Sequence, residues 1–410
     1  MTTALRPDDG LCQPGFPSLP VEEYATRLQR LQETLRDAGL CGVLLCNAAN
    51  VAYYSGFRTS IRAPNLVWAM LIVPASGEPH AVVSNALANL FRESSWLAKV
   101  HAFGGSRYWN LPADPVALAG DIVRNTCGAK GQLGLERSLG MRVELTIEEI
   151  ERLKHVVAGY ELVDAAPLIW QQRVIKTAWE QTLYRRLGHI TAAGFLSGLA
   201  VAREGVSERE IQRTMWGTFL ASGADDSPVG GQLMIRSGRE RNLTYCGRAT
   251  DRRLERGEQL MLAGGPGLQG YHIDIHRFAC IGPAPELQRA LFNQSEAGLV
   301  AGIAATRPGT TTQAVFEAAR TAMVREGMNS GVPWHVFGHG LGLDNYEPPM
   351  IRAEEPIEIV EGMVLTLEVP AYDIPQARVM GAFQEESVLV TANGCEVLTA
   401  GVPRDLWILD

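Results

Sequence analysis

Long apolar runs are missing from this sequence. No stretch approaches the ~18 consecutive apolar residues that span a bilayer. The opening Met-Thr-Thr-Ala-Leu-Arg-Pro also lacks the basic start and apolar core of a secretory signal. These absences argue against a membrane-spanning or exported chain, and we expect a cytoplasmic protein with no membrane partner.

Paired cysteines and basic blocks are missing as well. The 7 cysteines are odd in number and include no Cys-x-x-Cys pair, which argues against a disulfide framework and against a thiolate zinc site. The net charge is -8, with no run of lysines and arginines. We therefore expect no nucleic-acid partner, because neutralising phosphates requires a basic surface.

What remains is the composition of an ordinary globular protein, with 46% hydrophobic and 20% charged residues. At 410 residues the chain exceeds the size at which a single core usually stops growing, so two domains are expected. Residues 1–18, rich in Pro, Gly and Asp, are predicted to form an irregular arm. Residues 19–165 alternate helix and strand patterns, beginning with an amphipathic helix over 21–38, and are predicted to form an α/β domain.

A linker is predicted over residues 166–178, before a second domain over 179–410. That second domain opens with a helical pattern over 179–199. Strand patterns then follow from residue 232, helices are predicted over 285–305 and 312–326, and strand patterns return toward the end of the chain. The second domain is therefore predicted to be α+β.

Titratable residues recur at every second position in Gly-Tyr-His-Ile-Asp-Ile-His-Arg-Phe, residues 270–278. In an extended strand this spacing places His272, Asp274 and His276 on one face and Tyr271 on the other, apolar face. A half-exposed strand with a solvated polar face gives the same pattern, so the segment alone does not define a site.

Three further segments, 336–342, 363–370 and 382–388, carry polar groups within apolar strand patterns. A carboxylate such as Glu368 is costly to bury unless a cation or a donor satisfies it. His339 lies between two glycines, where backbone can approach a ligand closely.

The order and spacing of these segments, together with the Phe-Gly-His-Gly-Leu-Gly and Glu-Pro-Pro elements, resemble the pita-bread family of creatinase, aminopeptidase P, prolidase, methionine aminopeptidase and ectoine hydrolase. The resemblance implies a creatinase-like α/β domain over 19–165 and an α+β pita-bread catalytic domain over 179–410. It also implies a homodimer.

The metal-dependent members of this family use five ligands, and the resemblance places them at Ala263, Asp274, His339, Glu368 and Glu385. Four match, but alanine stands where the family has an aspartate. In the family's two-metal site that aspartate chelates one ion, while a bridging Asp and a bridging Glu are shared by both ions.

The retained residues Asp274, His339, Glu368 and Glu385 therefore imply one divalent ion, either Mn, Fe, Co or Zn, with an open position for water. A metal-free site is the alternative. In it three clustered carboxylates cannot all stay ionised, so one takes up a proton and could act as an acid.

Two positions at which the family's peptidases carry histidine hold Cys246 and Tyr346 in this chain. In creatinase the first of these is the catalytic base. A thiol at Cys246 could be a nucleophile, although a small buried residue is the alternative. The segment Tyr271-His272 and the alanine at 263 look like ectoine hydrolase. The resemblance places Arg62 in an N-terminal domain that reaches toward the active site of the neighbouring subunit, where it could bind a substrate carboxylate. The alternative is an arginine that faces solvent.

His276 replaces the Thr or Ser that the family usually has before the following arginine. It is predicted to be a fifth ligand, an orienting group or a proton shuttle. His272 follows Tyr271 at a position that often contacts the substrate in this family. A purely structural role is open for both histidines.

We therefore predict a hydrolase that cleaves a carbon–nitrogen bond, of amide, amidine or ureido type, in a small amino-acid-derived molecule. The predicted catalytic residues are His272, His276, His339, Glu368 and Cys246, and the predicted substrate contacts are Arg62, Tyr271 and Tyr346. The alternatives are a divergent Xaa-Pro dipeptidase or aminopeptidase, a lyase similar to the dimethylsulfoniopropionate lyases, and a non-catalytic pita-bread binding module.

Overall fold

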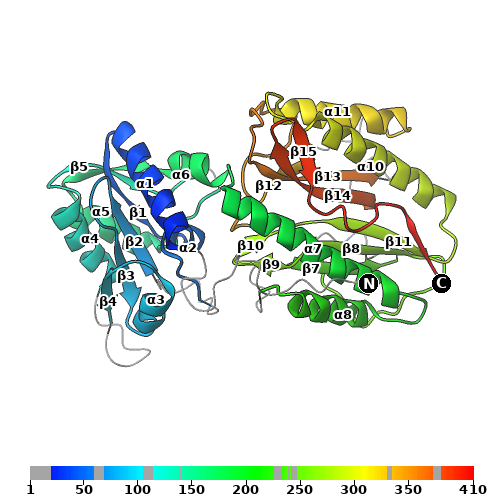
Figure 1. Cartoon of the computed structure of the whole chain (residues 1–410), viewed down its shortest axis with the longest axis horizontal. Coiled ribbons are helices and arrows are strands. Elements are labelled where there is room, and N and C mark those ends of the chain that lie inside the picture. The colour runs from blue at the N-terminus through cyan, green and yellow to red at the C-terminus, as the bar shows by residue number, and fades with distance from the viewer. Residues whose placement is uncertain are drawn as a thin grey trace. The chain divides into compact units, whose positions relative to one another are not determined.

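The computed structural model describes residues 20–59, 69–104, 114–138, 140–225, 232–238, 241, 247–329, 335–372 and 380–410. The predicted arm over 1–18 lies outside these ranges, and so do the predicted site residues Arg62 and Cys246. The described chain forms two compact units that divide between Arg173 and Val174 (Figure 1). The division falls within 166–178, where the sequence predicts a linker, although helix α6 (Ala166–Arg173) occupies the first part of that range.

The first unit is built on a six-stranded mixed sheet in the order β4-β3-β2-β1-β5-β6. Its central strand β1 pairs antiparallel with β2 and parallel with β5. The strands are β1 (Leu40–Leu45), β2 (Ala69–Pro74), β3 (His80–Ser84), β4 (Lys99–Phe103), β5 (Gly131–Leu135) and β6 (Tyr160–Asp164). The helices before α6 are α1 (Val21–Asp37), α2 (Ala48–Ser55), α3 (Ala88–Ser94), α4 (Pro115–Thr126) and α5 (Ile147–Val156).

The helix predicted over 21–38 forms as α1 because its apolar residues fall on one side of the helix. Tyr24, Leu28, Leu31 and Leu35, spaced three or four residues apart, are buried. The α/β class predicted for this part of the chain is confirmed.

The second unit is built on an eight-stranded sheet whose main path runs β12-β13-β14-β11-β8-β7, with β15 paired to β14 and β16 to β11. The strands are β7 (Gln232–Ser237), β8 (Gln259–Gly265), β11 (His276–Ile281), β12 (Gly338–Gly340), β13 (Val364–Tyr372), β14 (Met380–Thr391), β15 (Gly394–Val397) and β16 (Trp407–Leu409). A separate pair joins β9 (Gly267–Leu268) to β10 (Tyr271–His272). The helices are α7 (Ala178–Val201), α8 (Glu208–Ala221), α10 (Glu286–Ala305) and α11 (Thr312–Arg325).

Two helix pairs, α7 with α8 and α10 with α11, pack on this sheet (Figure 1). Leu262 of β8 belongs to the core cluster that contains α7 and α8, so its neighbour Ala263 points away from them. Leu367 and Val369 of β13 pack with α10 and α11, so Glu368 between them points away from those helices. The α+β class is confirmed.

The continuous strand predicted over 270–278 is interrupted. β10 ends at His272 and β11 begins at His276, so Asp274 lies in a short irregular segment. There the hydroxyl of Ser387 in β14 takes the place of a partner strand's backbone. It donates to the Asp274 carbonyl at 2.6 Å and accepts from the Asp274 amide at 3.3 Å. Side-chain hydrogen bonds of this kind compete with regular strand pairing.

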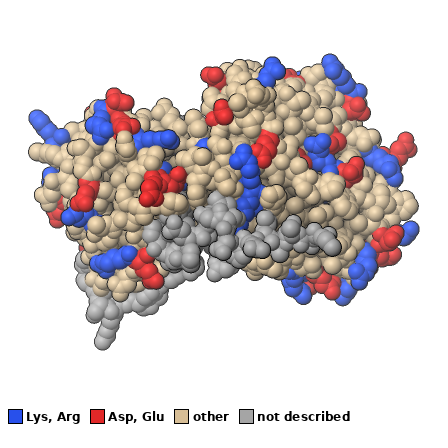
Figure 2. Space-filling view, viewed as in Figure 1, with Lys and Arg blue, Asp and Glu red and all other residues tan. Residues whose placement is uncertain are grey.

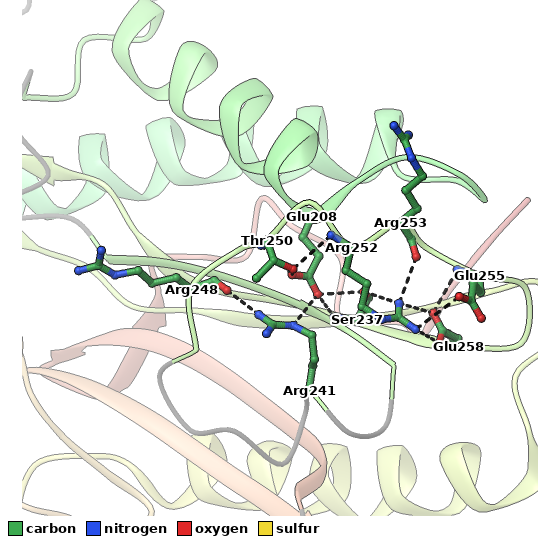
Figure 3. Close-up of polar contacts among 9 residues, drawn as sticks. All are labelled: Glu208, Ser237, Arg241, Arg248, Thr250, Arg252, Arg253, Glu255 and Glu258. Carbon is green, nitrogen blue, oxygen red and sulfur yellow. Dashed lines mark hydrogen bonds and ion pairs between the residues drawn. The ribbon is translucent and has the colours of Figure 1, made fainter.

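A buried carboxylate ties the start of α8 to the sheet (Figure 3). Glu208 accepts hydrogen bonds from the amide and hydroxyl of Ser237, from Arg241 Nε, and from the amide and hydroxyl of Thr250. Each carboxylate oxygen therefore has donors, which offsets the cost of burying the charge.

Charges of both signs are interspersed over the described residues of the face seen in Figure 2, which shows no broad basic area. Within the described part of the chain, every helix is too short or too polar to span a bilayer.

Candidate metal centre

Strand pairing brings the predicted ligands into one row. His276 of β11 lies directly opposite Glu385 of β14, and Glu385 lies opposite Glu368 of β13. On the next strand, His339 of β12 lies opposite Thr366, two residues before Glu368. Directly opposed side chains lie on the same face of a sheet, so the register itself places these groups together.

Asp274, His276 and Glu385 form the tightest group. One possible ligand atom from each lies within 4.8 Å of the other two, and all three residues are buried. His276 Nε2 is 3.2 Å from Glu385 Oε2. Two residues that sequence analysis missed hold the carboxylates: Thr366 donates to Glu385 Oε1, and Asn345 Nδ2 donates to Asp274 Oδ2 at 3.2 Å.

His339 and Glu368 form the second group. His339 Nε2 lies 2.6 Å from Glu368 Oε1, and the other ring nitrogen, Nδ1, is 2.8 Å from the Gly340 carbonyl. A ring N–H on Nδ1 donates to that carbonyl, which leaves a lone pair on Nε2, the arrangement usual for a metal-binding histidine. The Tyr346 ring packs against the imidazole with 4.0 Å between centroids.

The glycines beside His339 are required by protein backbone. A Cβ on Gly338 would lie 2.0 Å from the Thr366 carbonyl oxygen, and one on Gly340 would lie 2.3 Å from the Pro348 carbonyl oxygen. Any other residue at these positions would force β12 away from β13 or from Pro348, and the imidazole would move with it.

Burial and mutual repulsion raise the pKa values of two of these carboxyl groups. Burial, followed by the charge of Glu368, raises the pKa of Asp274 to about 7. Burial, with Asp274 and Glu368, raises the pKa of Glu385 well above its usual range. These directions follow from crowding carboxylates in a medium of low polarity.

The two histidines are shifted in opposite directions. Burial lowers the pKa of His276 well below its usual range, and the nearby Arg236 and Arg277 lower it further. Burial also acts to lower the pKa of His339, but the negative charge of the adjacent Glu368 outweighs it, so the net shift is upward.

The buried polar atoms fit a cation. Among the described residues, no hydrogen-bond partner reaches His276 Nδ1, His339 Nε2, Glu368 Oε1 or Glu385 Oε2. Buried groups of this kind are costly unless an ion or a proton satisfies them. A set of imidazole nitrogens and carboxylate oxygens suits Mn, Fe, Co or Zn. Ala263, which is fully buried, adds no donor.

Not every predicted site residue joins this row. Tyr271 is buried in the core beneath α7, where its hydroxyl donates to Glu180 Oε1 at 2.6 Å. His272 lies in β10, and its amide donates to the Gly342 carbonyl at 2.9 Å. His272 is not part of the group within 4.8 Å that Asp274 forms in the described chain.

The fold and this row of carboxylates and imidazoles are those expected of a hydrolase of the pita-bread class. Residues 182–392 match metallopeptidase family M24, and residues 27–175 match the creatinase/prolidase N-terminal domain. The chain belongs to metallopeptidase family M24. The predicted family and the predicted hydrolase acting on carbon–nitrogen bonds are thereby confirmed.

The chain is 25% identical over 383 residues to an uncharacterized peptidase of Bacillus subtilis (strain 168), covering 93% of this chain and 100% of the relative. It is 28% identical over 263 residues to an Xaa-Pro dipeptidase of Pyrococcus horikoshii, covering 64% of this chain and 73% of the relative. Among solved structures it is similar to a prolidase from Thermococcus sibiricus, with a TM-score of 0.81, 21% identity, and coverage of 94% of this chain and 99% of that one. The structural likeness shows the fold.

Proposed function

We propose that this chain hydrolyses the carbon–nitrogen bond of dipeptide-sized substrates, with a divalent metal ion held by Asp274, His339, Glu368 and Glu385. The observation that carries the proposal is the 2.6 Å approach of His339 Nε2 to Glu368 Oε1. Two buried lone-pair atoms at that distance need a proton or a cation between them. Membership of a metallopeptidase family supports the cation.

When bound, such an ion would polarise the carbonyl of the scissile bond and make water easier to deprotonate. The carboxylates around the ion differ in their exposure to solvent, and we use this difference to assign the proton acceptor. The side chain of Glu385 is fully buried, whereas that of Glu368 is 13% exposed, so we assign to Glu368 the proton lost by the attacking water.

Proton transfer then completes the cleavage. The water oxygen forms the new bond to carbon, the carbon–nitrogen bond breaks, and the leaving nitrogen takes from Glu368 the proton that the water lost. Thr366 and Asn345 keep the other two carboxyls in place. His272 stays a candidate for this proton donor, because its side chain is buried two residues before Asp274.

The substrate class is supported by the names of the relatives, which include Xaa-Pro dipeptidases. A second candidate, the small amidine or ureido compound predicted from sequence, is favoured by Tyr346. This ring is 48% exposed and packs on His339, at a position where the resemblance places a histidine in peptidases. A tyrosine there cannot accept or deliver a proton as imidazole does near neutral pH.

The test is a substrate panel in isotopically labelled water, analysed by mass spectrometry. Metal-loaded protein is incubated with Xaa-Pro dipeptides, with other dipeptides, and with amidine and ureido derivatives of amino acids. The proposal expects the N-terminal amino acid released from a dipeptide to carry the label in its new carboxylate. Label in an amidine or ureido product alone selects the second candidate. An unlabelled alkene product identifies a lyase, and no product from any compound contradicts hydrolysis of this class.

Other predictions from the sequence stay predictions. They are the homodimer, the cytoplasmic location, the substrate anchor at Arg62 and the catalytic role of Cys246. Light scattering of the purified chain checks the first of them.

A further inference from the structure

The proposed function leaves one buried side chain of the row without a role. His276 is 4% exposed and lies on β11 between two partner strands. Ala263 of β8 is directly opposite it on one side, and Glu385 of β14 is directly opposite it on the other. The three side chains therefore share one face.

Ala263 and His276 are complementary in size. Directly opposed residues of an antiparallel pair have Cβ atoms about 4.5–5.5 Å apart, so a carboxylate on residue 263 would extend into the space beside residue 276. Ala263 has no atom beyond its Cβ, which leaves this space for an imidazole. The Phe383 ring meets the imidazole edge-on, with 4.3 Å between centroids, and this contact fixes the direction of the ring.

The position of His276 Nε2 fits that of a metal ligand. Two donors bound to one ion, each about 2.1 Å away and at angles near 90–110°, lie roughly 3.0–3.4 Å apart. His276 Nε2 is 3.2 Å from Glu385 Oε2. That oxygen accepts no hydrogen bond from any residue that the structure describes, so the contact is not a hydrogen bond. A carboxylate oxygen of Asp274 completes a set of three within 4.8 Å.

We propose that Asp274, His276 and Glu385 hold a second divalent ion, with the imidazole of His276 in place of the carboxylate that is absent at Ala263. The inference rests on the proposed metal-dependent function, because Asp274 and Glu385 serve both ions. The centre then holds two ions per chain, although one of the family's ligand positions is an alanine. Nitrogen in place of oxygen favours Zn, Co or Fe over Mn at this second position.

The first test counts ions. Metal-free protein is titrated with Co by calorimetry, and the bound metal is confirmed by elemental analysis. Wild type is expected to bind two ions per chain. H276F, which keeps a ring but removes both nitrogens, is expected to bind one. The swapped variant A263D/H276S, which returns a carboxylate to β8, is expected to bind two again and to bind Mn more tightly than wild type does.

The outcomes separate this inference from the proposed function. One ion in wild type, retained in H276F and lost in H339A, overturns the second position and leaves the proposed function standing. No ion in wild type overturns both. If H276F does not fold, wild type alone decides. Saturation with Co should give the electron paramagnetic resonance signature of a coupled pair, and the signal of isolated ions alone would overturn the inference.

Discussion

His339 Nε2 lies 2.6 Å from Glu368 Oε1 across the pairing of β12 with β13, and the side chain of His339 is only 1% exposed. At this distance the two acceptor atoms must either share a proton or bind the same ion. Replacing Glu368 by Gln keeps the shape but removes the negative charge. Turnover of the preferred substrate should fall by about 10²–10⁴-fold, the usual contribution of a general base.

Steady-state kinetics measures this loss, and the unfolding temperature of E368Q serves as the control for folding. A variant that folds normally and keeps its full kcat/KM would show that Glu368 takes no part in the reaction.

Acid–base titration of the centre should make the metal-free protein less stable as the pH rises. The folded pKa values of Asp274 and Glu385 lie above their usual values, so the folded state holds extra protons. Stability from such groups is complete below their unfolded pKa and is lost as the pH rises through the folded pKa. The raised pKa of His339 acts in the same direction.

The lowered pKa of His276 acts in the opposite direction, but it does so below its ordinary value of 6.5. The useful window therefore begins at about pH 7.5, where His276 is almost entirely neutral in both states. Over this window the free energy of unfolding of the metal-free protein should fall, while metal affinity should rise because the ligands must lose protons to bind. Urea unfolding at several pH values measures the first effect. E385Q should flatten the dependence, and an equally steep slope in E385Q would contradict this explanation.

A buried ion pair supports the segment that carries Asn345 and Tyr346. Lys176 Nζ lies 3.4 Å from Glu347 Oε2, and the two side chains are 2% and 1% exposed. The variant K176M would leave the Glu347 carboxylate without this cation, at a cost of about 3–5 kcal/mol. Urea unfolding should show this loss, and the double variant K176M/E347Q should recover part of it. A single variant as stable as wild type would mean that Glu347 is neutral or held by other groups.

The carboxylate of Glu208 should stabilise the fold without affecting the metal centre. The variant E208A would leave the buried amide of Ser237 and the amide of Thr250 without their acceptor, at a cost of about 1–3 kcal/mol for each unsatisfied group. E208Q retains one oxygen and should lose less. Unfolding measures the cost, and metal binding, which should be unchanged in both variants, is the matched control. Weaker metal binding in E208Q would link this network to the centre.

The sequence predicts which residues form the row better than it predicts which residues pair with them or hydrogen-bond to them. Period and spacing identified α1 and the apolar face that buries Tyr271, and the resemblance identified Asp274, His339 and Glu385. The pairing of His276 with Ala263 could not be predicted, because register between strands far apart in the sequence is not encoded in either strand alone.

The interruption at Asp274 was missed for a related reason. Alternation predicts one strand through residues 270–278, but Ser387, more than a hundred residues later, takes the hydrogen bonds that the strand would need. Asn345 was missed because no local pattern marks a loop amide that reaches a carboxylate. Thr366 was within reach of sequence reasoning, since it lies two residues before Glu368 and so shares its face.

We propose that the row from His276 to His339 hydrolyses a carbon–nitrogen bond with the help of bound metal. The most direct measurement follows dipeptide hydrolysis while metal-free protein is titrated with Mn or Co. Turnover should be absent at the start, rise with metal occupancy, and stay absent in H339A. Full turnover by the metal-free protein, or turnover unchanged in H339A, would contradict the account.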